Sequence, residues 1–96
     1  MKIDKRRWFS SRTARRIGRE IGVDFREVDL DEFRRGLYVE LEHSKGLGTN
    51  IVHGDLQLTG RIAWAHLKEI RDYYTRLLKM EREAEIAAAL KRRASR

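Results

Sequence analysis

The stretch EFRRGLYVELEHSKG, residues 32–46, places a glutamate where a helix would bury a leucine. If the stretch is helical, with successive residues about 100° apart, Phe33, Leu37 and Leu41 form one apolar face. On the same projection Glu40 lies at roughly −20° from Phe33, inside that face. A buried carboxylate needs a partner, because an unpaired charge in the core is strongly destabilising. The stretch therefore predicts a helix and a polar contact within the core.

A second stretch, residues 59–78, places polar residues on an apolar face in the same way. With Ile62 set at zero, His66 falls at roughly 40° and Glu69 at roughly −20°, both inside the apolar face. Asp72 falls at roughly −80°, on the border of that face. Two predicted helices thus present polar side chains towards the core.

Each of these helices carries a histidine and a glutamate three residues apart, on or beside its apolar face: Glu40, His43, His66 and Glu69. Imidazole and carboxylate ligands on facing helices suit a divalent metal, and Glu-x-x-His pairs build di-iron sites in helical bundles. The four residues are therefore a candidate metal site, with acid–base catalysis as a second use. The alternative is a structural hydrogen-bond network, in which Glu40 accepts from His66 and either Tyr73 or Tyr38 completes the network.

Capping signals predict where the first two helices begin and end. The chain has no proline and seven glycines, which favours helices joined by glycine-marked loops. Ser10 or Ser11 can cap a first helix that ends at Gly22. A second helix is predicted to begin at the capping residue Asp29 and to run to about His43.

A third and longer helix is predicted to begin at the cap Thr59 and to continue for roughly thirty residues, or about 45 Å. The preceding loop, Ser44 to Leu58, is long for a compact domain and is expected to cover the seam between the last two helices. The predicted fold is all-α: a small three-helix domain with a long C-terminal helix and a long ordered loop between helices two and three. The predicted core consists of Leu30, Phe33, Leu37, Leu41, Ile62, Ile70, Tyr73 and Leu77.

Basic residues are concentrated at the two ends of the chain, whose formal net charge is +7. Residues 1–16 contain seven basic residues and one acidic residue, and residues 91–96 contain four basic residues and no acidic one. The part between them is therefore mildly acidic. We divide the chain into a basic N-terminal arm, 1–9, a single helical domain, 10–90, and a basic C-terminal tail, 91–96.

The basic ends are candidates for contact with nucleic acid, because arginine and lysine neutralise phosphates and an aromatic ring can stack on a base. The alternative is a solvated surface rich in arginine. The candidate residues are Lys5, Arg6, Arg7, Trp8, Arg12, Arg15, Arg16, Arg92 and Arg93.

Several functional classes are excluded by what the sequence lacks. Without cysteine there is neither a disulfide nor a thiolate metal site. The longest apolar run, Ile86 to Leu90, is too short to span a membrane, so a soluble protein of the cytoplasm or of a virion is expected. No phosphate-binding glycine loop, Gly-x-Ser-x-Gly elbow or His-Glu-x-x-His motif occurs. The acidic segment after Gly22 is too long for the turn of a helix-turn-helix motif.

Three segments, VDLDEFRRGLYVELEH, GTN and LTGRIAWAHLKEIRDYYTRLLKMEREA, resemble in order and spacing a small family of uncharacterised bacterial and phage domains. The resemblance covers about residues 28–84 and implies a small domain without an assigned reaction. It departs at Ser44, where members have glycine, and at Gly54–Asp55, where members have two acids. The polar positions it implies are Glu40, Glu42, His43, Thr49, Asn50, Asp55, His66, Glu69, Asp72 and Tyr73. Those outside the four metal candidates, together with His53, form a secondary polar cluster of Glu42, Asn50, His53, Asp55, Asp72 and Tyr73.

These observations favour a non-enzymatic accessory or binding module, phage-related, whose basic ends contact nucleic acid without sequence preference. One alternative is a small metal-binding protein or metal-dependent hydrolase that uses the Glu/His cluster. Another is a structural homo-oligomer that associates through the long last helix. A close-packing face on that helix is formed by Met80, Ala84, Ala87 and Ala88.

Overall fold

The computed structural model describes residues 9–46 and 55–95, and these residues form four α-helices without any strand. The helices are α1 (Ser11–Ile21), α2 (Leu30–Gly46), α3 (Leu56–Glu69) and α4 (Tyr73–Ala94). The prediction of an all-α fold is confirmed. The prediction of three helices is wrong in number, because the expected long third helix is divided into α3 and α4.

The first two helices begin and end close to their predicted positions. The Ser10 hydroxyl caps α1 by accepting from the backbone N–H of Thr13, and Gly22 ends it with φ of +98°, a conformation that favours glycine. The Asp29 carboxylate accepts from the backbone N–H of Glu32 and so caps α2. Local capping chemistry therefore decides these boundaries.

The start of α3 differs from the predicted start at Thr59. The cap is Asp55, whose carboxylate accepts from the backbone N–H of Leu58 at 2.9 Å. Thr59 is one turn inside the helix and fully buried, and its hydroxyl donates to the backbone carbonyl of Asp55. The connection between α2 and α3 is thus shorter than predicted, and its residues 47–54 lie outside the described part.

The break between α3 and α4 is the main departure from the predicted architecture. Ile70 has an extended backbone, with φ of −135° and ψ of 113°, and it follows Glu69 at the end of α3. The helical projection placed Ile70 and Tyr73 in one continuous apolar stripe, but Ile70 is 43% exposed and Tyr74 is the fully buried residue. The break turns the chain so that Tyr74 enters the core.

The core lies where α1, α2 and α3 meet, and the first residues of α4 close it. Phe33 and Leu37 are fully buried as predicted. Leu30, Tyr73 and Leu77 are partly buried and pack against the core, and Leu41 and Ile62 are half-buried. The buried apolar residues are Ala14, Ile17, Val23, Phe33, Leu37, Tyr38, Val39, Ala63, Leu67 and Tyr74.

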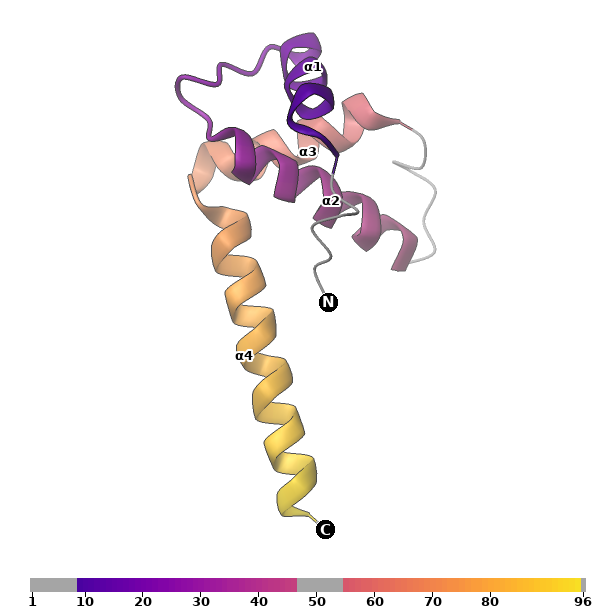
Figure 1. The fold of residues 1–96 in the computed structure, drawn as a ribbon, viewed down its shortest axis with the longest axis vertical. Coiled ribbons are helices and arrows are strands. Elements are labelled where there is room, and N and C mark those ends of the chain that lie inside the picture. Colours follow the sequence, from indigo (N-terminus) through magenta and orange to yellow (C-terminus); the bar gives the residue numbers. More distant parts are fainter. Residues whose placement is uncertain (1–8, 47–54, 96) are drawn as a thin grey trace.

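Helix α4 packs against α2 at its start and then leaves the body of the molecule, as Figure 1 shows. Tyr74 is its buried residue, whereas every described residue from Arg82 to Ser95 is exposed. The molecule is therefore elongated, with extents of 52 × 29 × 25 Å. Lys91 to Ala94, predicted to belong to a tail, continue the helix.

Within residues 9–46 and 55–95, no helix combines the length and the apolar character needed to cross a membrane.

Candidate functional site

Glu40, the glutamate on the apolar face of α2, meets residues of α3 and α4. The Tyr74 hydroxyl donates to Glu40 Oε2 at 2.7 Å, and His66 Nδ1 lies 3.2 Å from the same oxygen. The predicted contact between Glu40 and His66 is confirmed. The tyrosine that completes the network is Tyr74, and not Tyr73 or Tyr38, because the break before α4 turns Tyr74 inward.

The hydrogen bonds of this cluster decide which His66 nitrogen carries a proton. Burial, and then the hydrogen bond to Glu40, raises the pKa of Tyr74, so its hydroxyl keeps its single proton and donates it to Glu40. The hydroxyl oxygen lies 3.0 Å from His66 Nδ1 and can only accept there. Nδ1 therefore carries a hydrogen, and Nε2 is the basic nitrogen of the neutral ring.

The cluster is only partly shielded from solvent. The side chain of Glu40 is 15% exposed and that of His66 is 36% exposed. The Tyr73 ring stacks on the His66 ring, with centroids 4.4 Å apart and planes 9° from parallel. This stacking holds the imidazole against Glu40. The arrangement matches the hydrogen-bond network that the sequence analysis left open as the structural alternative.

The two other candidate metal ligands do not join Glu40 and His66. His43 is exposed near the end of α2, and Glu69 is exposed at the last residue of α3, where the chain leaves the helix. Among the described residues, no three His, Asp or Glu side chains are grouped so that they could hold a metal ion. The described ranges thus bring two of the four predicted ligands together.

The members of the predicted secondary cluster are dispersed. Asp55 caps α3, and Asp72 accepts from Arg76 Nε at 2.7 Å, an ion pair that lowers the pKa of Asp72. Tyr73 stacks on His66, and Glu42 is half-buried on α2. The remaining two candidates, Asn50 and His53, lie outside the described residues, as does Thr49 of the resemblance.

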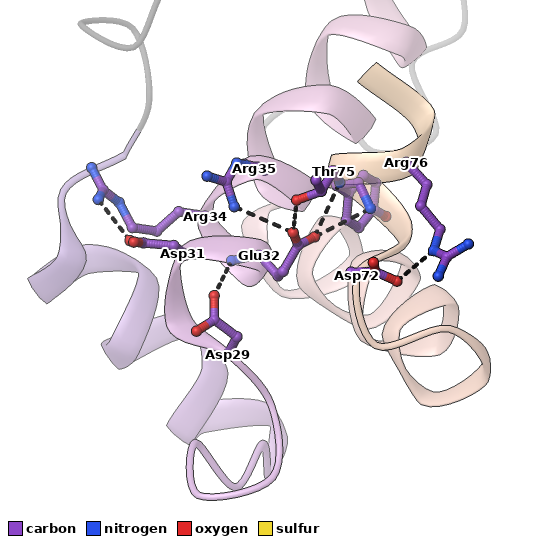
Figure 2. A network of polar contacts seen from close by, with 9 residues as sticks. Asp29, Asp31, Glu32, Arg34, Arg35, Asp72, Thr75 and Arg76 are labelled. Atoms are coloured by element: carbon purple, nitrogen blue, oxygen red, sulfur yellow. Dashed lines mark hydrogen bonds and ion pairs between the residues drawn. The ribbon is translucent and has the colours of Figure 1, made fainter. Parts of the chain in front are cut away.

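A second buried carboxylate, Glu32, stands three residues after Asp29, where a local capping box at the start of α2 would place it. Its carboxylate instead reaches α4, where it accepts from the backbone N–H groups of Tyr74 at 3.2 Å and Thr75 at 3.3 Å (Figure 2). The Thr75 hydroxyl also donates to it, and Arg35 Nη1 lies 3.3 Å away. Glu32 thus caps a helix that begins more than 40 residues later in the chain.

The position that precedes α4 is occupied by Asp72, whose side chain makes no capping hydrogen bond. Glu32 supplies the missing acceptor, and its negative charge is favourable at the positive end of the α4 dipole. The sequence does carry one signal for this boundary, because Asp72 before Tyr73 is a capping residue type at a possible helix start. The source of the cap could not be read from sequence, since it belongs to another helix.

The basic candidates fall into separate places. Arg12, Arg15 and Arg16 are exposed on α1. Arg19, which is not among the predicted candidates, is exposed on the same side, because residues 12, 15, 16 and 19 recur at helical spacing. We call these four residues the arginine face of α1. Arg92 and Arg93 are exposed at the far end of α4, and Lys5, Arg6, Arg7 and Trp8 lie outside the described residues.

The arginine face lies opposite the buried side of α1, which consists of Ala14, Ile17 and Gly18. Its four arginines and Glu20 line a surface hollow. Arg16 Nη1 lies 3.4 Å from Glu20 Oε1, and Glu20 also accepts from Gln57 of α3. Within the described part of the chain, no ion pair involves the other three arginines of this face.

A protein-family model with the description "Protein of unknown function (DUF5661)" matches residues 14–83. The chain belongs to this family. No curated protein and no solved structure gives a significant match.

The DUF5661 match includes both buried carboxylates, Glu32 and Glu40, and their partners His66, Tyr74 and Thr75. It also includes three of the four arginines of the α1 face. It ends at residue 83, after the exposed Met80 and before the exposed Ile86 and Leu90 of α4. The part of the chain that the DUF5661 family describes therefore coincides with the body and with the attachment of α4.

Proposed function

We propose that this protein is a non-enzymatic binding module whose arginine face on α1 contacts the phosphate backbone of nucleic acid without reading its sequence. A phage-related accessory role, which the resemblance of the sequence implies, would suit such a module. The observation that carries the proposal is the exposed row of arginines on α1, three of which have no ion pair among the described residues.

The spacing of the arginine face suits an extended polyanion. Arg12 and Arg19 are seven residues apart, or about 10 Å along the helix axis. Phosphates of a nucleic-acid strand follow one another at about 3.4 Å along the duplex axis, so the face can meet several of them. Guanidinium groups bind phosphate through paired hydrogen bonds, which favours arginine over lysine in this role.

The position of the face on α1 gives an electrostatic reason for an anionic partner. The first turn of α1 has no acidic residue, and Arg12 lies in that turn. Positive side chains near a helix N-terminus oppose the helix dipole, so an anion bound there relieves the conflict. A solvated arginine surface would have the same appearance, and a binding experiment separates the two interpretations.

The test is the salt dependence of binding to a fluorescently labelled duplex of about eight base pairs, followed by anisotropy. Such a duplex is about 27 Å long, too short to reach from α1 to the far end of α4 in a molecule 52 Å long. We expect tight binding at low salt that weakens steeply as salt is raised. Changing the base sequence should leave the affinity within about twofold.

A double variant that carries Arg15→Gln and Arg19→Gln should make the negative slope of log affinity against log salt shallower by about two. Each lost phosphate contact removes roughly 0.9 from the size of that slope. The matched control changes two exposed arginines elsewhere, Arg61→Gln and Arg82→Gln, and removes the same net charge. Its slope should remain near that of the unaltered protein. Equal losses in both proteins would mean that net charge alone attracts the duplex, and the proposal would be wrong.

A further inference from the structure

The outer half of α4 carries large apolar side chains that the body of the molecule does not cover. Met80 is 59% exposed, Ile86 is 54% exposed and Leu90 is 58% exposed. At about 100° per residue, these three side chains lie within roughly 120° of one another around the helix. They therefore lie on one side of α4, which we call the α4 face. By the same projection this side also carries Lys79 and Glu83, whose charged atoms lie 3.9 Å apart. Burial of its apolar side chains is favourable.

The charges of α4 are ordered along its axis. Before the apolar stretch Ile86 to Leu90, Glu81, Glu83 and Glu85 outnumber the two basic residues Lys79 and Arg82. After it, Lys91, Arg92 and Arg93 follow one another without an acidic residue. A partner helix with the opposite order of charges would complement α4. A second copy of α4 has that order when it runs antiparallel, whereas in a parallel pair like charges would face each other.

The length of the uncovered helix agrees with the charges. Burial by the body ends at about Leu78, and α4 continues to Ala94. If Met80 of one copy lies opposite Ala94 of an antiparallel partner, the centre of the overlapping segment is at Ala87. The same centre sets residues 81–85 opposite residues 89–93, so the acidic part of one helix meets the basic part of the other. In this register the end of each helix stops short of its partner's body.

We propose that α4 binds a second copy of this chain through the α4 face, with the two helices antiparallel about a twofold axis near Ala87. The overlap is about fifteen residues, or about 22 Å of helix. The contact is isologous, because each copy presents the same surface to the other. The proposal does not depend on nucleic-acid binding, since it uses no residue of the arginine face.

Sedimentation equilibrium of the full chain over a wide concentration range tests the association. We expect a reversible monomer–dimer equilibrium, and Leu90→Glu should raise the dissociation constant at least tenfold because it places a charge within the α4 face. The matched control is Ala88→Glu, which adds the same charge to the same helix at about 160° from both Ile86 and Leu90 and about 80° from Met80. The sequence pattern grouped Ala88 with Met80 in a close-packing face, but this position lies outside the α4 face. The control should change the constant by less than about threefold. Circular dichroism should show the same helix content in both variants.

Disulfide trapping tests the antiparallel direction, and it is unambiguous because the chain has no cysteine of its own. Met80→Cys mixed with Ala94→Cys should give a mixed disulfide dimer under mild oxidation. Met80→Cys alone should give little, because the two Met80 positions lie at opposite ends of the pair. A monomer at all concentrations, an equal effect of the two glutamate variants, or efficient crosslinking between two Met80→Cys chains would overturn the proposal.

Discussion

Tyr74 is the residue at which the contacts of α4 with the rest of the molecule meet. Its hydroxyl donates to Glu40, its backbone N–H donates to Glu32, and its ring lies against Gly36. All three partners are on α2, one turn apart along the same side of that helix. A single fully buried residue thus fixes the start of α4 to α2 through both its backbone and its side chain.

Removal of the Tyr74 hydroxyl should destabilise the protein more than removal of another buried hydroxyl. Tyr74→Phe removes the hydroxyl that lies 2.7 Å from Glu40 Oε2 and 3.0 Å from His66 Nδ1. The loss of both contacts should lower the free energy of unfolding by about 1–3 kcal/mol. Tyr38→Phe is the matched control, because Tyr38 is also buried but its hydroxyl makes no hydrogen bond among the described residues. Urea unfolding followed by circular dichroism measures both. Equal losses would mean that the network contributes nothing specific.

Tyr74 should also make stability depend on alkaline pH. Burial raises its pKa above the ordinary value, so above about pH 10 the unfolded chain loses a proton that the folded chain keeps. The unfolded state is then favoured. Above about pH 10, the titration of this tyrosine should lower the free energy of unfolding by about 1.4 kcal/mol for each unit of pH. The difference between the unaltered protein and Tyr74→Phe, measured by urea unfolding from pH 8 to pH 11, isolates this effect. A difference that stays constant over that range would contradict the assignment.

Gly36 lies where α2 crosses α3 and α4, and it has no room for a side chain. A Cβ there would come within 2.6 Å of the Tyr74 ring and 2.8 Å of Ala63 Cβ. A Gly→Ala change inside an exposed helix usually stabilises it by about 1 kcal/mol. At Gly36 the sign should reverse, with a loss of about 1–3 kcal/mol from overpacking. Gly60→Ala should cost less, since its nearest neighbour is a side-chain methyl of Ile17 at 3.0 Å, and thermal unfolding compares the two variants.

At the scale of helices, local signals predict α1 and α2 but not the division between α3 and α4. Apolar residues recur at helical spacing through Ile62, Ile70 and Leu77, so the sequence pattern continues across the break. What favours the break is the contact of Tyr74 and Thr75 with Glu32, more than 40 residues earlier. A tertiary contact overrides the local periodicity there.

The capping of α4 by Glu32 can be tested by comparing the substitution of Glu32 with that of Asp72, the residue that precedes α4 in the sequence. Glu32→Ala leaves the N–H groups of Tyr74 and Thr75 without an acceptor and should lower the free energy of unfolding by about 2 kcal/mol, the upper end of measured cap effects. Asp72→Ala should change it by less than about 0.5 kcal/mol, because Asp72 makes only an exposed ion pair with Arg76. Urea unfolding decides, and a larger loss at Asp72 would contradict this assignment of the cap.

The candidate site was predictable as far as it depends on one turn of each helix. Glu40 and His66 are found together because each falls within the apolar face of its own helix. Glu69 is not found with them because the buried side of α3 carries Ala63 and Leu67 and is not centred on Ile62, so Glu69 lies on the opposite, exposed side of the helix. Tyr74 was missed for a different reason, since the projection of an unbroken helix turned Tyr73 inward instead.

At the scale of the whole molecule, the uneven charge seen in the sequence becomes a separation in space. The arginine face of α1 lies on the body, and the basic end of α4 lies at the far end of the molecule (Figure 1). Composition predicted that the two ends of the chain are basic. It could not predict that the second basic group is carried away from the body on a helix, because that depends on the break before Tyr73.

Helix α4 is attached to the body only through its first turns, so its direction is determined at that attachment, which acts as a pivot. Its 22 residues measure about 33 Å, so a tilt of about 10° at the pivot displaces the far end by about 6 Å. The pivot is determined by a few atoms of Glu32, Gly36 and Tyr74. Substitutions at these buried positions can therefore move Lys91, Arg92 and Arg93 through several ångströms without altering any of them. Changes at a few interior positions would thus alter how far the basic end of α4 lies from the body while leaving the surface residues unchanged.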